Sequence, residues 1–137
     1  MELKLTNVAR ASLEELRLDY EDFLRHRRLM LWAWNDPRRA ELIRRRPCSA
    51  DAVAQWAQDV KNGRNGLNGH EKSSDSPVRS RHSISYAEIA SNGALALIAA
   101  ACSLLERQLA SLAEAFEKDG GFTERLYRTR QRMRRSP

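Results

Sequence analysis

The feature of this chain that most constrains its fold is a run of apolar side chains spaced alternately three and four residues apart. This spacing is that of one face of an α-helix. The members of the run are Leu95, Ile98, Cys102, Leu105, Leu109, Leu112 and Phe116. Ser85 and Glu88 have the spacing of a capping box before it, and Gly120 with Gly121 suits a left-handed helix end after it. We therefore expect one helix over about 85–118, with the seven positions forming a continuous dry seam in the core or at an oligomer contact.

A second amphipathic stripe opens the chain and predicts a long helix over about 3–27. Its members are Leu5, Ala9, Leu13, Leu16, Tyr20 and Phe23. No Ser, Thr, Asp or Asn precedes the first of them to cap the helix. An apolar stripe that opens without a cap suggests a missing upstream segment, or a partner that covers the stripe.

Local signals predict three short helices. Asp36 can cap a helix that starts with Pro37 and runs over about 37–46. Ser49 offers a cap for a helix over about 50–61, and an arginine-rich helix follows over about 123–135. No run of alternating β-branched or aromatic residues predicts a strand. The expected fold class is all-α, a partial up-and-down bundle dominated by the two long helices.

The chain divides into three parts. Residues 62–83 are rich in Gly, Ser and Asn, with Leu67 and Val78 as the only sizeable apolar side chains, and we expect a flexible polar loop there. Residues 1–61 and 84–121 are expected to form the helical bundle. Residues 122–137 form a basic C-terminal helix or tail.

The net charge of +6 is concentrated in two arginine blocks. Residues 25–47 carry eight arginines against two carboxylates, and residues 122–137 carry six arginines against one. Arginine's planar donor fork suits phosphate, so these blocks are candidates for electrostatic, sequence-independent binding of a nucleic acid. The candidate residues are Arg38, Arg39, Arg44, Arg45, Arg46, Arg125, Arg128, Arg130, Arg132, Arg134 and Arg135. The alternative interpretation is a solvated face or a cationic tail that aids solubility.

Three tryptophans lie near the first arginine block and can stack on bases, but packing is the favoured interpretation. Trp32 and Trp34 follow Leu29, Met30 and Leu31, and tryptophans beside such residues usually pack a bundle end or an oligomer contact. Trp56 shares the predicted inner face of the helix over 50–61 with other apolar residues.

No grouping of residues indicates an enzyme, a metal site, a cofactor or a small-molecule substrate. His26, His70 and His82 lack ligand spacing with one another and with Cys48 or Cys102. The carboxylates of the first helix lack a His or metal partner and are interpreted as its solvated face: they are Glu14, Glu15, Asp19, Glu21 and Asp22.

The location of the protein is expected to be the cytoplasm. The first residues alternate charged and apolar side chains, unlike a secretory signal, and both thiols are expected to be reduced. The longest apolar run, 94–105, is shorter than the roughly 20 residues that cross a bilayer, so no membrane partner is expected.

Two segments resemble a known family. The segment 3–16 is similar to a helix of the four-helix-bundle proteins encoded in intervening sequences of large-subunit ribosomal RNA genes. The matching residues are Leu5, Ala9, Arg10, Ala11, Ser12, Glu15 and Leu16. The segment 119–128 resembles the end of a longer family variant that carries a helical suffix after the bundle. The resemblance covers 1–61 and 84–135.

The resemblance implies that the chain corresponds to the C-terminal part of the family fold. Family members carry two further helices ahead of the segment that opens this chain, so the resemblance suggests a truncated member or a partner that supplies those helices. The bundle is distantly similar to the accessory variability determinant of diversity-generating retroelements, which forms a ring of subunits and works with reverse transcriptase and RNA. The resemblance therefore implies a helical oligomer with a basic surface toward nucleic acid, and no catalytic residues.

Two hypotheses follow for function. The first is a non-enzymatic helical-bundle protein that assembles with itself or a related helical chain and binds RNA or DNA through its arginines. The second is an assembly or scaffold module whose basic segments contact an acidic protein instead of a nucleic acid.

Overall fold

The computed structural model describes residues 2–63 and 83–135, and these residues form helices joined by short connections, with no strand among them. The helices are α1 (Glu2–His26), α2 (Pro37–Arg45), α3 (Ala50–Lys61), α4 (Tyr86–Asp119) and α5 (Phe122–Arg135). Every boundary lies within one residue of its predicted position, and the all-α fold class is confirmed. Most of the predicted polar loop, 64–82, lies outside the described residues.

Side-chain caps fix the starts of three helices, as the sequence predicts. The Asp36 carboxylate accepts the Arg38 N–H at 2.9 Å, and Ser49 Oγ accepts the Ala52 N–H at 3.2 Å. Ser85 Oγ accepts the Glu88 N–H at 3.1 Å. Each bond satisfies one of the backbone donors that a helix start leaves without an intrahelical acceptor.

The end of α4 differs from the predicted left-handed turn. Gly120 has φ 73° and ψ 168°, so its φ is positive but its ψ lies far from the left-handed helical region. Only glycine adopts this backbone conformation without a large cost, because a Cβ would clash with the neighbouring backbone. A Cβ at this position would also overlap the Glu124 carboxylate. The helix therefore stops where the sequence predicts, by a different backbone geometry.

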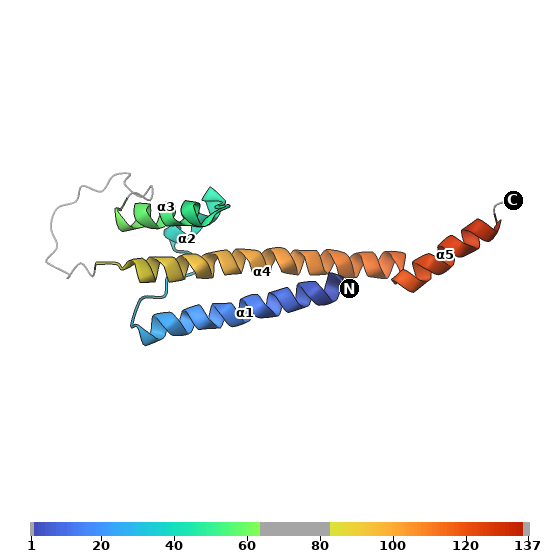
Figure 1. The fold of residues 1–137 in the computed structure, drawn as a ribbon, viewed down its shortest axis with the longest axis horizontal. Helices are drawn as coiled ribbons and strands as arrows, with labels where there is room; N and C mark the ends of the chain where they lie inside the picture. Colours follow the sequence, from blue (N-terminus) through green and yellow to red (C-terminus); the bar gives the residue numbers. More distant parts are fainter. Residues whose placement is uncertain (1, 64–82, 136–137) are drawn as a thin grey trace.

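The long helix α4 is the axis of the molecule, and the other bundle helices flank it (Figure 1). α1 runs antiparallel to α4 along one side, and α2 with α3 covers the first half of α4 on the other side. An ion pair between Arg10 and Glu106, 2.9 Å apart, marks the register of α1 against α4. α5 continues beyond α4 at the far end of the molecule, apart from α1, α2 and α3.

The main core lies where α2, α3 and the α1–α2 connection meet α4. Its buried members are Trp32, Leu42, Trp56, Ala57, Val60, Ile89 and Ala96. The Trp32 and Trp56 rings pack edge to face with centroids 6.1 Å apart, an arrangement that the charge distribution of aromatic rings favours. Trp56 also lies directly on α4 at Gly93, where a Cβ would come within 2.6 Å of the indole. The small residue is required because it makes room for the ring.

A buried amide holds the α1–α2 connection on α4. The Asn92 side chain is completely buried, and its Oδ1 accepts the backbone N–H of Trp32 at 2.8 Å. Its Nδ2 donates to the carbonyl of Met30 at 2.8 Å and to that of Glu88 at 2.9 Å. The Glu88 carboxylate in turn accepts the Trp32 indole N–H at 3.3 Å. The Trp32 N–H and the Met30 carbonyl, in the irregular segment before α2, are therefore paired.

The predicted seam of α4 is dry over only part of its length in the isolated chain. Leu95, Ile98 and Cys102 are buried, and burial raises the pKa of the Cys102 thiol. The next three positions are half-buried: Leu105, Leu109 and Leu112. Phe116, the last one, is 54% exposed. The expectation of a continuous dry seam is therefore wrong for this chain alone beyond Cys102.

The register of α1 explains why Phe116 is exposed. Because α1 and α4 run antiparallel, each turn beyond Glu106 on α4 lies opposite a turn before Arg10 on α1. Phe116 lies almost three turns beyond Glu106, where the described part of α1 ends. Within residues 2–63 and 83–135, no other helix covers this position.

The apolar stripe of α1 is only partly covered by α4. Thr6 and Leu24, outside the stripe, are buried, and Leu13 and Tyr20 of the stripe are half-buried. Leu5 is 64% exposed, and Leu16 and Phe23 are also exposed. The stripe borders an apolar groove whose α4 wall includes Ala87 and Ala90. Periodicity identified the apolar face correctly, but the described chain leaves much of that face open.

Replacing the buried amide tests its role in the fold. In Asn92→Ala the Trp32 N–H and the Met30 carbonyl lose their buried partner, so the free energy of unfolding should fall by about 3 kcal/mol. Urea denaturation followed by circular dichroism measures this change. The control Asn7→Ala removes an exposed amide from α1 and should change stability by no more than about 0.5 kcal/mol. Equal stability of Asn92→Ala and Asn7→Ala would contradict this structural role of the Asn92 amide.

Candidate nucleic-acid interface

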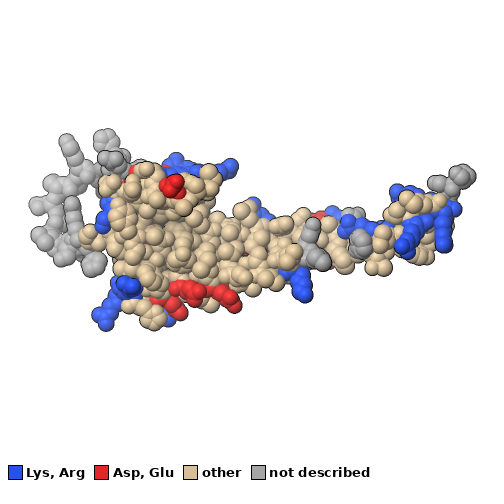
Figure 2. Space-filling view, in the orientation of Figure 1, with Lys and Arg blue, Asp and Glu red and all other residues tan. Residues whose placement is uncertain are grey.

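The arginines of α5 form an exposed basic helix without internal charge compensation. Arg125, Arg128, Arg130, Arg132 and Arg134 are exposed, and the structure gives none of them an ion pair with a described carboxylate. Arg125 Nε donates to the carbonyl of Gly120 at 3.3 Å. Figure 2 shows this basic cluster at one end of the molecule and a group of acidic side chains over α1. Arg135 belongs to α5, but its side chain is outside the described set.

The arginines of α2 are mostly committed to carboxylates within the fold. Arg38 binds both oxygens of Asp36, at 2.9 and 2.7 Å, and its guanidinium lies 3.7 Å from the centroid of the Trp32 ring. Arg45 binds Glu41 at 3.0 Å and Asp59 at 2.7 Å, and Arg44 also binds Glu41. These three arginines, all predicted nucleic-acid ligands, are thus largely neutralised where they lie.

The ion pairs stabilise the charged forms of the two carboxylates on and before α2. The hydrogen bonds from Arg38 lower the pKa of Asp36, although partial burial opposes them. The hydrogen bonds from Arg45 and Arg44 lower the pKa of Glu41 in the same way. Both carboxylates therefore contribute stability that is present at neutral pH and lost on acidification.

The three tryptophans have different environments. Trp32 and Trp56 are buried in the core, in agreement with the packing prediction. Trp34, by contrast, is 77% exposed, so the prediction that it packs is wrong for the isolated chain. The guanidinium of Arg39 lies over its ring, 4.8 Å from the centroid. Trp34 lies two residues after Trp32, in a turn before α2 where the Asp36 N–H donates to the Ala33 carbonyl at 3.0 Å.

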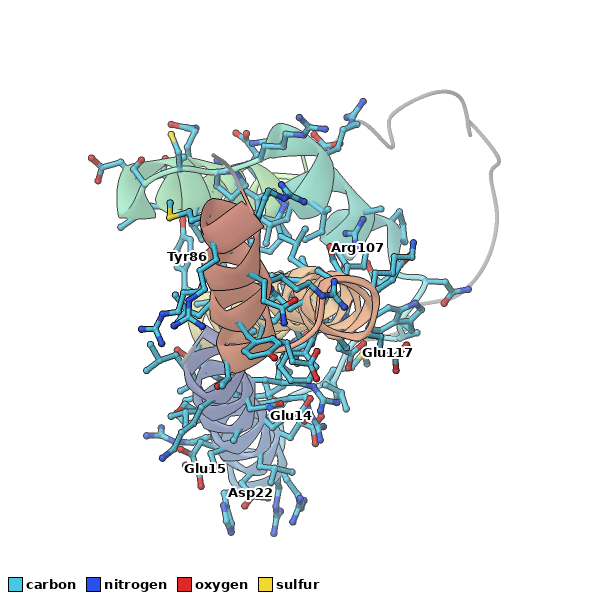
Figure 3. The ribbon with its side chains drawn as sticks, turned by 90° about the vertical axis from the view of Figure 1, so that its right-hand side faces the viewer. Glu14, Glu15, Asp22, Tyr86, Arg107 and Glu117 are labelled. Atoms are coloured by element: carbon cyan, nitrogen blue, oxygen red, sulfur yellow. The ribbon has the colours of Figure 1, made fainter. Side chains whose placement is uncertain are left out.

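Trp34 borders a groove of about 900 Å³ between α2 and the middle of α4. Three arginines of its lining form no ion pair with a described carboxylate: Arg39, Arg46 and Arg107. Figure 3 shows Arg107 on the side of α4 that faces α2, and Glu15 and Asp22 on α1 at the opposite side of the molecule. Sequence reasoning missed Arg107, because a single arginine in a mostly apolar helix carries no clustering signal.

The remaining candidate groups are dispersed. Cys48 is exposed and unpaired, Cys102 is buried, His26 is exposed, and His70 and His82 lie outside the described residues. No group of three or more His, Cys, Asp or Glu side chains in the described parts of the chain is placed to hold a metal ion.

By length and composition alone, α4 is apolar enough to cross a membrane. The qualifying span is Tyr86–Lys118, whose most apolar window has a mean hydropathy of 1.6. Half of that window is buried by the rest of the protein, as in the core helix of a bundle. The prediction that the protein has no membrane partner stays a prediction.

Comparison with known protein families, with curated proteins and with solved structures finds no match for this chain. The resemblance to the bundle proteins of ribosomal RNA intervening sequences therefore stays a prediction based on the residues that carry it.

The Asp36–Arg38 pair gives a testable pH dependence. Because folding lowers the pKa of Asp36, its contribution is complete above the unfolded value of about 3.9 and is lost as pH falls through the folded value. Asp36→Asn retains a capping side chain but removes the charge. The variant should be less stable than the parent at pH 7, and this difference should shrink as pH falls below the unfolded pKa of about 3.9.

Denaturation at several pH values measures this difference. The control Asp19→Asn removes an exposed carboxylate for which the structure gives no ion pair, and its effect at pH 7 should be smaller. A stability difference for Asp36→Asn that persists unchanged at pH 3 would show that the cap, and not the charge, carries the effect.

Proposed function

We propose that this chain is a non-enzymatic helical-bundle protein of the cytoplasm that binds RNA or DNA through its uncompensated arginines. It assembles with itself or with a related helical chain. This is also the function that the resemblance to the intervening-sequence bundle proteins implies.

The observation that carries the nucleic-acid proposal is the contrast between α2 and α5. Arg38, Arg44 and Arg45 have carboxylate partners, whereas the described arginines of α5 extend into solvent. A helix that presents arginines without counter-charges is a favourable place for phosphates, because binding releases condensed counterions from the nucleic acid. The sequence contains no recognised base-reading motif, so we expect this binding to be largely electrostatic.

The observation that favours assembly is the open apolar surface along α1 and α4. Leu5 and Leu16 of α1 and Phe116 of α4 are exposed in the isolated chain. Exposed apolar residues that follow helical spacing on neighbouring helices are typical of a contact with another helix. The alternative function, an assembly module whose basic segments contact an acidic protein, depends on this surface alone.

Neutralising α5 tests the nucleic-acid proposal. Replacing Arg128, Arg130, Arg132, Arg134 and Arg135 by Gln should abolish binding in a gel-shift assay at physiological salt and leave the helical content unchanged. For the unchanged protein, affinity should fall steeply with added salt, with a slope near −0.7 to −0.9 per phosphate contacted.

A control with the same change in net charge shows whether the position of the arginines on α5, and not the total charge of the protein, determines binding. The control replaces by Gln five basic residues that lie on α1, just after α1 or near the end of α4: Lys4, Arg25, Arg27, Arg28 and Lys118. Each is exposed, so the fold should persist, and nucleic-acid affinity should change far less than in the α5 variant. Undiminished binding by the α5 variant would refute the role of this helix.

Phe116→Asp tests the assembly proposal. The side chain is 54% exposed, so the substitution should leave the helical content of the chain unchanged. If the seam continues into a contact with another copy, the buried charge should dissociate the assembly, as measured by sedimentation velocity. The control Leu18→Asp changes a residue of similar exposure, 52%, on the face of α1 away from the stripe and should leave the assembly intact. A Phe116→Asp variant of unchanged mass would contradict the seam contact.

A further inference from the structure

The groove between α2 and α4 combines an open aromatic ring with unpaired cations over a floor of small residues. Its floor is formed by four small residues of α4, whose short side chains leave space above the helix: Ala96, Ala99, Ala100 and Ser103. Trp34, Arg39, Arg46 and Arg107 belong to its lining, together with the exposed apolar side chains of Ile43 and Leu104. The volume of about 900 Å³ is within the range of sites that hold a small organic ligand or a few linked units of a polymer.

The aromatic component is the exposed indole of Trp34. The Arg39 guanidinium lies over one face of the ring, 4.8 Å from the centroid, and the ring remains 77% exposed. An indole held in this way has one face available for stacking on another planar group. Trp32 and Trp56 cannot act like this, because both are buried in the core.

The charged component is an excess of arginine. The two acidic neighbours of the groove are already engaged, since Asp36 binds Arg38 and Glu41 binds Arg44 and Arg45. Partial burial lowers the pKa of Arg39, and Asp36 offsets this effect only in part. A partly desolvated cation without an ion pair gains more from an incoming anion than a fully solvated one does.

We propose that this groove binds single-stranded nucleic acid, with a base stacked on Trp34 and the neighbouring phosphates held by Arg46 and Arg107. Stacking platforms beside basic side chains are the usual means of binding single strands. A duplex keeps its bases paired and stacked inside, so it has no free base face for Trp34 and binds only through phosphates. This inference rests on the proposed function and specifies the strand form and the site.

The second chemistry that fits the groove is an acidic amphipathic helix. The small apolar floor suits a helix, and α1 of a second copy carries both carboxylates and open apolar residues. The exposed ring of Trp34 favours the nucleic acid, because a helix that packed on Ala96 and Ala100 would not require an aromatic stacking surface at the rim.

The test measures binding of the full chain to a short oligothymidylate and to a duplex of the same length. Trp34→Ala should weaken single-strand binding by roughly tenfold and leave duplex binding within about twofold, because only the single strand stacks. Arg107→Gln should also weaken single-strand binding. Binding of the oligothymidylate should quench tryptophan fluorescence in the unchanged protein, and the quenching should be absent in Trp34→Ala.

Matched controls stand elsewhere on the surface. Tyr86→Ala removes an exposed aromatic ring from the start of α4, and Arg25→Gln removes an exposed arginine from α1. Both should leave the fluorescence quenching in place and single-strand affinity within about twofold. Circular dichroism verifies that Trp34→Ala keeps its fold, as its exposed side chain predicts.

The possible outcomes separate this inference from the proposed function. Equal single-strand binding by Trp34→Ala and the unchanged protein overturns the groove site and leaves the proposed function standing. No binding of either nucleic acid by the unchanged protein overturns both. A change of sedimenting mass in Trp34→Ala or Arg107→Gln, without a change in single-strand binding, assigns the groove to a second copy of the chain and overturns the nucleic-acid site.

Discussion

The arrangement of this protein depends on the hydrogen bonds of one buried amide. Asn92 lies on α4, the axis of the bundle, and its side chain binds backbone groups of Met30 and Trp32. These bonds place the segment between α1 and α2 against α4, which in turn places Trp32 in the core beside Trp56. Since α2 begins only a few residues later, its position over α4 follows from the same contact. The groove, with Trp34 and Arg39, is therefore a consequence of the core.

Local signals allowed the helices to be predicted almost to the residue. Asp36, Ser49 and Ser85 act as caps in the structure because capping depends only on neighbours within one turn. The ion pairs of Arg44 and Arg45 with Glu41 have the same local origin, at spacings of three and four residues. The neutralisation of these two arginines could therefore have been predicted from the sequence.

What the sequence could not reveal was the set of tertiary neighbours. The stripe through Leu5, Leu16 and Phe23 is amphipathic as predicted, yet α4 covers only part of it and leaves these three side chains exposed. Trp32 and Trp34 are indistinguishable by composition, and only the path of the chain buries one and exposes the other. Arg107 becomes a candidate because α2 lies across from it, which no local pattern encodes.

The junction at Gly120 has a mechanical consequence for the basic helix. Because α5 lies apart from α1, α2 and α3, its direction is set mainly by the backbone torsions of one glycine and its neighbour. A change of a few tens of degrees in either torsion would alter the direction of the whole of α5 and leave the bundle unchanged. The orientation of the arginine array relative to the bundle is therefore set at this one junction and not by packing of α5 against α1, α2 or α3.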